Sequence, residues 1–283
     1  MNKYDRRRKY YMILDCETAT LPFVKDYAEE NRKNVAIAKP LIYDLGWTIV
    51  DNKGNIYAKK NYLITETFFV PAIFDTAYYK EKRPIYMAKL ANGEIEQANW
   101  NTAIHELIED LEAVEAVGAY NAMFDYKKAI PFTDLYIDKL YSNEYTEWLN
   151  IQHKVCDSIA RKGQTHKNPD FDEMNFVLRG EKYPLFDLWG LTCEHILNCD
   201  EYKQMCYDNN WTTASGKYFP TNAEKAFAFL STQEDFVEAH TAIEDAEIET
   251  LLFANIYRKT KGKFEMGIIF FPFRLLGRMG MDM

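Results

Sequence analysis

The chain has 283 residues, of which 47% are hydrophobic, and its formal net charge at pH 7 is −9. These values predict a globular protein with a large core, built as one elaborated domain or two small ones. The negative charge argues against a protein that coats long duplex nucleic acid, although an enzyme that grips a few nucleotides remains compatible with it. The sequence has no apolar run long enough to span a bilayer, and its five cysteines are irregularly spaced, so we expect a cytoplasmic protein without membrane contact.

The first predicted strand ends in two carboxylates. Residues 10–14 are apolar and β-prone, and Asp15 and Glu17 follow them directly. Because successive strand side chains point to opposite faces, Asp15 and Glu17 project together and Cys16 projects the other way. Two carboxylates this close repel each other unless a cation or a shared proton offsets the repulsion, and Mg²⁺ or Mn²⁺ would suit such oxygen ligands. A D-x-E at a strand end is more often a solvated turn, so a metal site requires further ligands from elsewhere in the chain.

The next segments predict a sheet with helices. After a polar excursion at 22–39, residues 41–50 and 56–64 read as a strand pair, which predicts an antiparallel meander with the first strand. Residues 102–111 carry apolar side chains at helical spacing, and residues 113–120 read as a buried strand.

A helix is expected to start after Asn121, with Asp125 in its first turn, and Pro131 interrupts or resets it. Residues 153–158 predict another short strand, followed by a helix. The order β-β-β-α-β-α-β-α favours an α/β fold in which helices pack around a mixed sheet.

The C-terminal half contains further predicted helices, at 185–197, 201–208 and 222–230. The strongest helix pattern runs from 242 to 257. Its side chains expected to face the core are Ile248, Leu251, Leu252 and Ile256.

We expect a single domain over residues 1–260, followed by a tail at 261–283 for which core packing is the favoured role. Two segments, at about 66–98 and 163–221, read as insertions. No linker-like tract separates the second from the rest, so it is interpreted as an elaboration rather than as an independent domain. The first is aromatic-rich, and a lid, a strand-guiding loop and a packed surface insertion are all compatible with it.

The last helix completes a candidate active site. Asp245 lies near its start, five residues after His240. Since five residues turn an ideal helix by about 140°, His240 is expected in the preceding loop, from which it can swing towards a metal-bound water. Four carboxylates and one histidine, namely Asp15, Glu17, Asp125, Asp245 and His240, suit two-metal phosphodiester hydrolysis with the imidazole as general base.

Three motifs in this order resemble a known family. Asp15-x-Glu17-Thr18, then Asn121-Ala122-x-Phe124-Asp125, then His240-x4-Asp245 are similar to the motifs of the DEDDh branch of the DnaQ-like 3′–5′ exonucleases. The resemblance covers residues 10–257. Asp157-Ser158 with the following residues also looks like the segment at which a strand leads into a helix in this family. Asp157 is expected to cap the following helix rather than to bind metal.

The resemblance implies a ribonuclease H-like, mixed five-stranded sheet whose first three strands are antiparallel. It implies two Mg²⁺ or Mn²⁺ ions held by Asp15, Glu17, Asp125 and Asp245, with His240 as the base. It also implies that Thr18 seats the terminal nucleotide and that Asn121 and Phe124 support the second motif.

The expected activity is release of nucleoside monophosphates from 3′ ends of single-stranded DNA. The alternatives are exoribonuclease or oligoribonuclease-like trimming of RNA, and, less favoured, a non-catalytic module that binds nucleic acid or a protein. The insertions favour a phage-encoded or mobile-element member, and the tail is a candidate contact for a protein partner or a dimer. Cysteine and histidine residues at 193–206 lack a C-x2-C chelate, so we expect no zinc site there.

Overall fold

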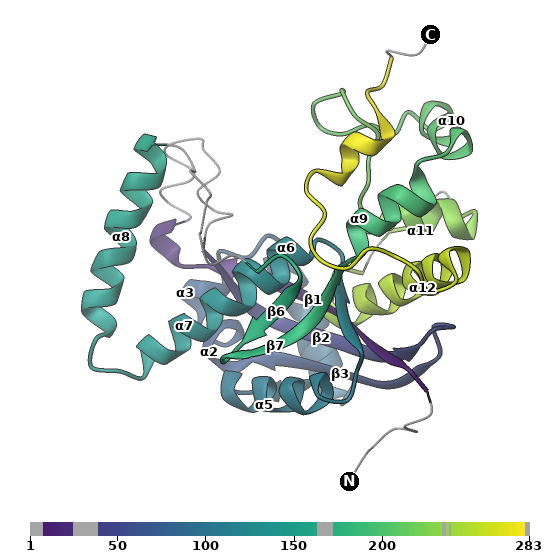
Figure 1. Ribbon diagram of the computed structural model, residues 1–283. Helices are drawn as coiled ribbons and strands as arrows, with labels where there is room; N and C mark the ends of the chain where they lie inside the picture. The colour runs from purple at the N-terminus through teal and green to yellow at the C-terminus, as the bar shows by residue number, and fades with distance from the viewer. Residues whose placement is uncertain (1–7, 25–38, 163–171, 234–235, 238, 281–283) are drawn as a thin grey trace.

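The computed structural model describes residues 8–24, 39–162, 172–233, 236–237 and 239–280, with only the backbone described for 156–162. Most of the polar excursion predicted at 22–39 lies outside these residues. Within the described part, the strands form one seven-stranded sheet in the order β4-β3-β2-β1-β5-β7-β6 (Figure 1). The strands are β1 Tyr10–Thr20, β2 Pro40–Asp51, β3 Ile56–Ile64, β4 Glu96–Ala98, β5 Ala116–Ala119, β6 Asn175–Leu178 and β7 Glu181–Asp187.

The strand directions confirm the predicted fold class. β1, β2 and β3 form the antiparallel meander, β5 pairs parallel with β1, and β7 pairs parallel with β5. The two edge strands extend this five-stranded core: β4 runs parallel to β3, and β6 runs antiparallel to β7. The sheet therefore has two strands more than the five expected.

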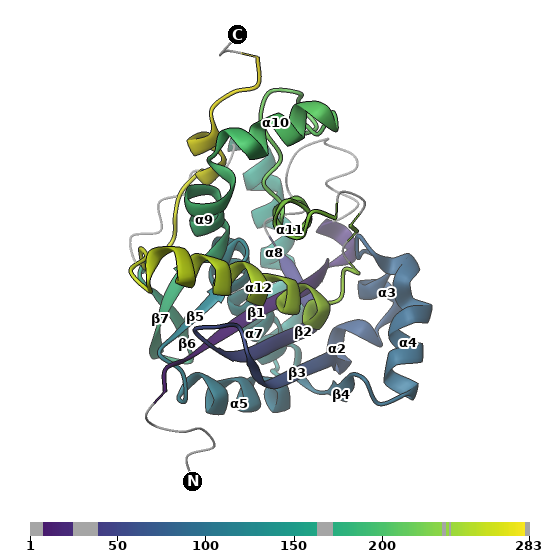
Figure 2. The ribbon, with the colours of Figure 1, turned by 90° about the vertical axis from the view of Figure 1, so that its right-hand side faces the viewer.

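Helices cover both faces of the sheet (Figure 2). The α-helices are α2 Thr65–Phe68, α3 Pro71–Phe74, α4 Arg83–Ala91, α5 Trp100–Leu111, α6 Ala122–Phe124, α7 Ile130–Leu140, α8 Tyr145–Lys162, α9 Leu188–Thr192, α10 Asp200–Asp208, α11 Ala223–Ser231 and α12 Ala242–Thr260. Short 3-10 segments lie at Lys80–Lys82 and Pro272–Leu276, and π-helical turns lie at Asp125–Ala129 and Cys193–Leu197.

Alternation along β1 divides the core into two layers. Met12 and Leu14 pack with buried side chains of α5 and α7, whereas Tyr11 and Ile13 pack with those of α9 and α12. β2 is buried along its whole length because helices lie on both of its faces. The face on which α12 lies is the one towards which Asp15 and Glu17 project.

The start of α12 lies directly against the sheet. A Cβ atom at Gly46 of β2 would lie 2.5 Å from the backbone nitrogen of Ile243, so only glycine allows this approach. Asp44, which is fully buried, accepts a hydrogen bond from the Ala242 backbone N–H at 2.9 Å. Further along, the hydroxyls of Thr48 and Thr250 are 2.8 Å apart. These contacts fix the position of the helix that carries Asp245.

Several sequence-based expectations about local structure are wrong. Residues 153–158 belong to helix α8, not to a strand; Trp148 and Gln152, four residues apart, are both buried on one helical face. The helix predicted from 185 starts at Leu188, because residues 185–187 pair with β5, a contact that local periodicity does not encode. Leu251 is 47% exposed, because the buried face of α12 is rotated towards its acidic residues.

The two segments predicted as insertions contain regular secondary structure. Residues 66–98 form α2, α3, α4 and β4, and several of their aromatic side chains are buried. The range 163–221 contains β6 and β7, so part of it is sheet rather than added surface. Because Asp157 lies within α8, it does not cap a following helix, and its side chain lies outside the described residues.

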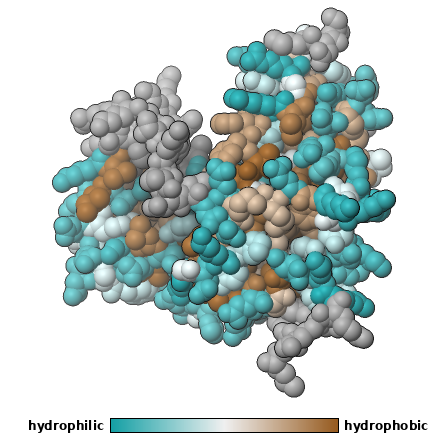
Figure 3. Space-filling model, in the orientation of Figure 1, coloured by the Kyte–Doolittle hydropathy of each residue, from teal (hydrophilic) through white to brown (hydrophobic). Residues whose placement is uncertain are grey.

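The C-terminal segment packs against β7. Gly267 donates its N–H to the Leu185 carbonyl at 2.7 Å, and Ile268 and Leu276 are buried. Apolar side chains nevertheless remain on the surface of this segment (Figure 3), since Phe270 and Phe271 are 50% and 57% exposed. Among the described residues, no helix combines the length and the apolar character needed to cross a membrane.

Candidate active site

β1 presents two of the predicted site residues. Asp15 and Glu17 are half-buried, and Cys16 between them is buried in the core layer of α5 and α7. The pairing of β1 with β2 changes register between Glu17 and Thr18, as in a β-bulge, a distortion that is common beside active sites. The predicted alternation therefore holds up to Glu17, and half-buried Thr18 follows the irregularity.

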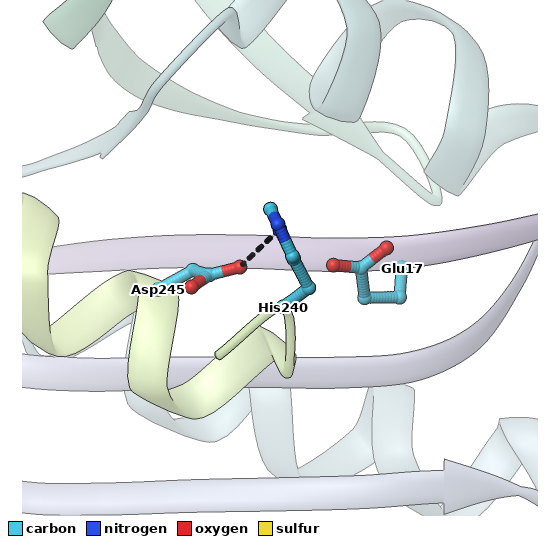
Figure 4. A group of neighbouring side chains, drawn as sticks. All are labelled: Glu17, His240 and Asp245. Atoms are coloured by element: carbon cyan, nitrogen blue, oxygen red, sulfur yellow. Dashed lines mark ion pairs between the residues drawn. The ribbon is translucent and has the colours of Figure 1, made fainter. Parts of the chain in front are cut away.

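The opposite end of the chain meets this strand. Glu17, His240 and Asp245 each offer one possible ligand atom, and these three atoms lie within 4.8 Å of one another (Figure 4). His240 Nδ1 is 3.9 Å from Asp245 Oδ2. Two carboxylates and one imidazole thus converge from β1 and from the region where α12 begins. Together they offer ligand atoms that can bind a hard divalent cation.

The segment at 66–98 holds His240 in place. The Tyr79 ring stacks on the His240 imidazole, with centroids 4.2 Å apart and planes inclined by 14°. Lys82 Nζ lies 5.0 Å from the centre of the Tyr79 ring and donates to the Ala239 carbonyl. Tyr86, which is fully buried, donates its hydroxyl proton to the His240 carbonyl at 3.1 Å. This segment thus orients the histidine, a role that none of the sequence-based alternatives included.

The crowding of carboxylates changes the proton affinity of Asp15. Burial raises the pKa of Asp15 well above its ordinary value, and the nearby carboxylates raise it further. In decreasing order, these carboxylates are those of Glu249, Asp125, Asp245 and Glu17. Burial lowers the pKa of His240, the charge of Lys82 lowers it further, and Glu224 opposes the change. A neutral imidazole can accept a proton, as a general base must.

Asp125 occupies a different position from the other carboxylates. It lies in the π-helical turn that precedes Pro131, and it accepts a hydrogen bond from Cys16 Sγ at 3.0 Å. Burial raises the pKa of Asp125 to about 7. The structure thus brings Asp125 to the Cys16 side of β1, close enough to Asp15 to influence it but outside the three-residue group.

Asn121 and Phe124 flank this turn. Asn121 adopts a left-handed backbone conformation, with φ of 81°, and its carbonyl accepts the Phe124 N–H at 2.7 Å. Asn121 is half-buried and lines a pocket beside the carboxylates, whereas half-buried Phe124 packs against the core layer of α5 and α7.

Glu249 is a site residue that the sequence analysis missed. It is only 2% exposed, its carboxylate accepts the Tyr120 N–H at 3.2 Å, and it is the strongest charged influence on Asp15. It follows Asp245 by four residues, so both project from one face of α12. Like charges four residues apart are unfavourable in an isolated helix, so the Asp245–Glu249 pair could have indicated from the sequence that Glu249 belongs to the site.

A pocket of about 420 Å³ adjoins these carboxylates. The carboxylates of Asp15, Asp245 and Glu249 line it together with the rings of Tyr120 and Trp189. Its remaining lining residues are Asn121, Thr221, Asn222 and Ala223.

Within the described residues, the group of Glu17, His240 and Asp245 is the one cluster of histidine, cysteine and acidic side chains with spacing suited to a metal ion. Cys193 and Cys206 are buried free cysteines.

Comparison with known proteins gives a weak structural likeness. No protein-family model matches the sequence, and no curated protein is significantly similar to it. Among solved structures, the chain is similar to Pop2p of S. pombe in a form with Mg²⁺ and Mn²⁺ bound. The sequence identity is 12% and the TM-score 0.42, over 93% of this chain and 90% of the other.

Proposed function

We propose that this protein is a metal-dependent 3′–5′ exonuclease that releases nucleoside monophosphates from single-stranded DNA ends. The observation that carries the proposal is the convergence of Glu17 with His240 and Asp245, within 4.8 Å, from opposite ends of the chain. The order of the three sequence motifs supports the DEDDh, DnaQ-like branch. A phage-encoded or mobile-element origin stays a prediction.

Each side chain has a role in this proposal. Asp15, Glu17, Asp125 and Asp245 would hold two Mg²⁺ or Mn²⁺ ions. Bound ions of this kind activate water and stabilise the leaving 3′ oxygen of a phosphodiester. His240, held by the stacked Tyr79 ring, would accept the proton of the attacking water. Thr18 would help to seat the terminal nucleotide, and Asn121 and Phe124 would support the second motif.

The test is digestion of 3′- and 5′-labelled single-stranded DNA and RNA of one sequence, with Mg²⁺, with Mn²⁺ and with EDTA. We expect stepwise shortening from the 3′ end that EDTA abolishes. Asp15→Asn should remove the activity while the fold remains intact, and Asp138→Asn, at an exposed position on α7, is the matched control. Full activity of Asp15→Asn would contradict the assignment.

The same experiment separates the alternatives. Faster digestion of RNA would favour the exoribonuclease, because discrimination of the 2′-hydroxyl depends on details of the pocket. Absence of cleavage with either metal would favour a non-catalytic binding module. The exposed Phe270 and Phe271 make the C-terminal segment the candidate contact for a protein partner or a second copy, which stays a prediction.

A further inference from the structure

The pocket beside the carboxylates has an aromatic wall. Tyr120 directly follows β5 and Trp189 is the second residue of α9, which directly follows β7. Since β5 and β7 are adjacent and parallel, their carboxyl ends lie side by side. The carboxyl ends of parallel strands are where α/β proteins commonly bind ligands. The two rings therefore line one pocket with Asp15, Asp245 and Glu249.

A single residue fixes the orientation of both rings. The Tyr120 hydroxyl donates to the Thr221 carbonyl at 2.7 Å, and Trp189 Nε1 donates to Thr221 Oγ1 at 2.9 Å. Phe273 from the C-terminal segment lies nearly parallel to Trp189, with centroids 6.4 Å apart and planes inclined by 21°. Because the polar ends of both rings are bonded to Thr221, the rings offer mainly carbon and π surface to the pocket.

The combination of walls defines the chemistry of a ligand. A flat aromatic group would stack on the rings, while a phosphate would lie near cations held by the carboxylates. A volume of about 420 Å³ is within the usual range for small-ligand sites. A nucleotide unites both groups, and stacking on aromatic side chains accepts any base.

The two rings lie beside the residues that the sequence motifs assign to the terminal nucleotide, without belonging to them. Asn121 lines the pocket, but neither Thr18 nor Phe124 does, and Trp189 belongs to the 163–221 range that departs from the compact motif pattern. We propose that Tyr120 and Trp189 form a subsite that stacks the unpaired base next to the terminal nucleotide, on the 5′ side of the scissile phosphate. The inference rests on the proposed function and deepens it: the subsite would select single strands without selecting sequence.

The test uses a single-stranded DNA hexamer with 2-aminopurine at the penultimate position, bound to the full chain with Ca²⁺ replacing Mg²⁺. Stacking quenches the fluorescence of this base, so binding to the wild type should quench it. Trp189→Leu should abolish the quenching and raise Kd about tenfold, and Trp189→Phe, which keeps a ring, should restore most of both. Tyr120→Leu tests the other ring in case Trp189→Leu fails to fold.

Trp211→Leu is the matched control, because Trp211 contacts Lys225 and does not line the pocket. When 2-aminopurine is placed at the 3′ end of the hexamer instead, its fluorescence on binding should be the same in Trp189→Leu as in the wild type. Unchanged quenching and Kd in folded Trp189→Leu and Tyr120→Leu would overturn the subsite, even if the wild type cleaves DNA. Conversely, quenching at the penultimate position without any cleavage in Mg²⁺ would support the subsite and contradict the proposed hydrolysis. A wild type that neither binds nor cleaves the DNA would overturn both the subsite and the proposed function.

Discussion

Removing one carboxylate from the site should stabilise the metal-free protein. The perturbation is Glu17→Gln, which preserves the shape of the side chain and removes its charge. The carboxylates of Glu17 and Asp245 lie within 4.8 Å of each other. At an effective dielectric constant of about 20, two unit charges at that distance repel by about 3 kcal/mol. We therefore expect the free energy of unfolding of Glu17→Gln in EDTA to exceed that of the wild type by up to about 3 kcal/mol.

Divalent ions should reverse this order, because they bind the native wild type. An ion present at a hundred times its Kd adds about 2.7 kcal/mol to the free energy of unfolding, and Glu17→Gln should gain much less. The assay is urea unfolding followed by circular dichroism, in EDTA and in Mn²⁺.

Glu247→Gln is the matched control on the same helix. Glu247 pairs with Lys59 at 2.8 Å on the surface, so its loss should cost at most about 1 kcal/mol and leave the response to metal unchanged. The reasoning would be refuted if Glu17→Gln were less stable than the wild type in EDTA, or if both gained equally from Mn²⁺.

Three further predictions concern the supports of the site. Burial raises the pKa of Asp187 to about 6, so between pH 4 and 6 the native state keeps a proton that the unfolded chain releases. The free energy of unfolding should therefore fall by about 3 kcal/mol as the pH rises through this window. Urea titrations at each pH should show that Asp187→Asn lacks this part of the decline. Tyr79→Ala should lower kcat with little change in KM and shift the His240 imidazole NMR signals, whereas Tyr79→Phe should preserve both; unchanged signals in Tyr79→Ala would contradict the stacking. Gly46→Ala places a Cβ atom 2.5 Å from the Ile243 nitrogen, so α12 must move and stability in urea should drop by about 1–3 kcal/mol; a wild-type midpoint would exclude this close approach.

Local patterns predicted most of the fold. The meander of β1, β2 and β3 follows from the apolar runs in the sequence, and the observed strands match it closely. The failures arose where partners are distant in sequence. β7 is a strand because it pairs with β5, while residues 153–158 are helical because α8 buries Trp148 and Gln152 on one face.

The sequence by itself determined which side chains share a face. Asp15 and Glu17 project together because strand side chains alternate, and the spacing from His240 to Asp245 separates a loop residue from one in the helix. These relations depend only on backbone geometry over a few residues. They predict the chemistry of the candidate site, including its preference for a hard cation.

Only the tertiary structure decided what surrounds those side chains. Glu249 reaches Asp15 because Gly46 lets α12 approach the sheet, and Tyr79 stacks on His240 because a distant segment packs beside the loop. The pocket with Trp189 likewise requires β5 and β7 to end together. Such contacts follow from the packing of whole elements against one another, and no periodicity within a single segment encodes them.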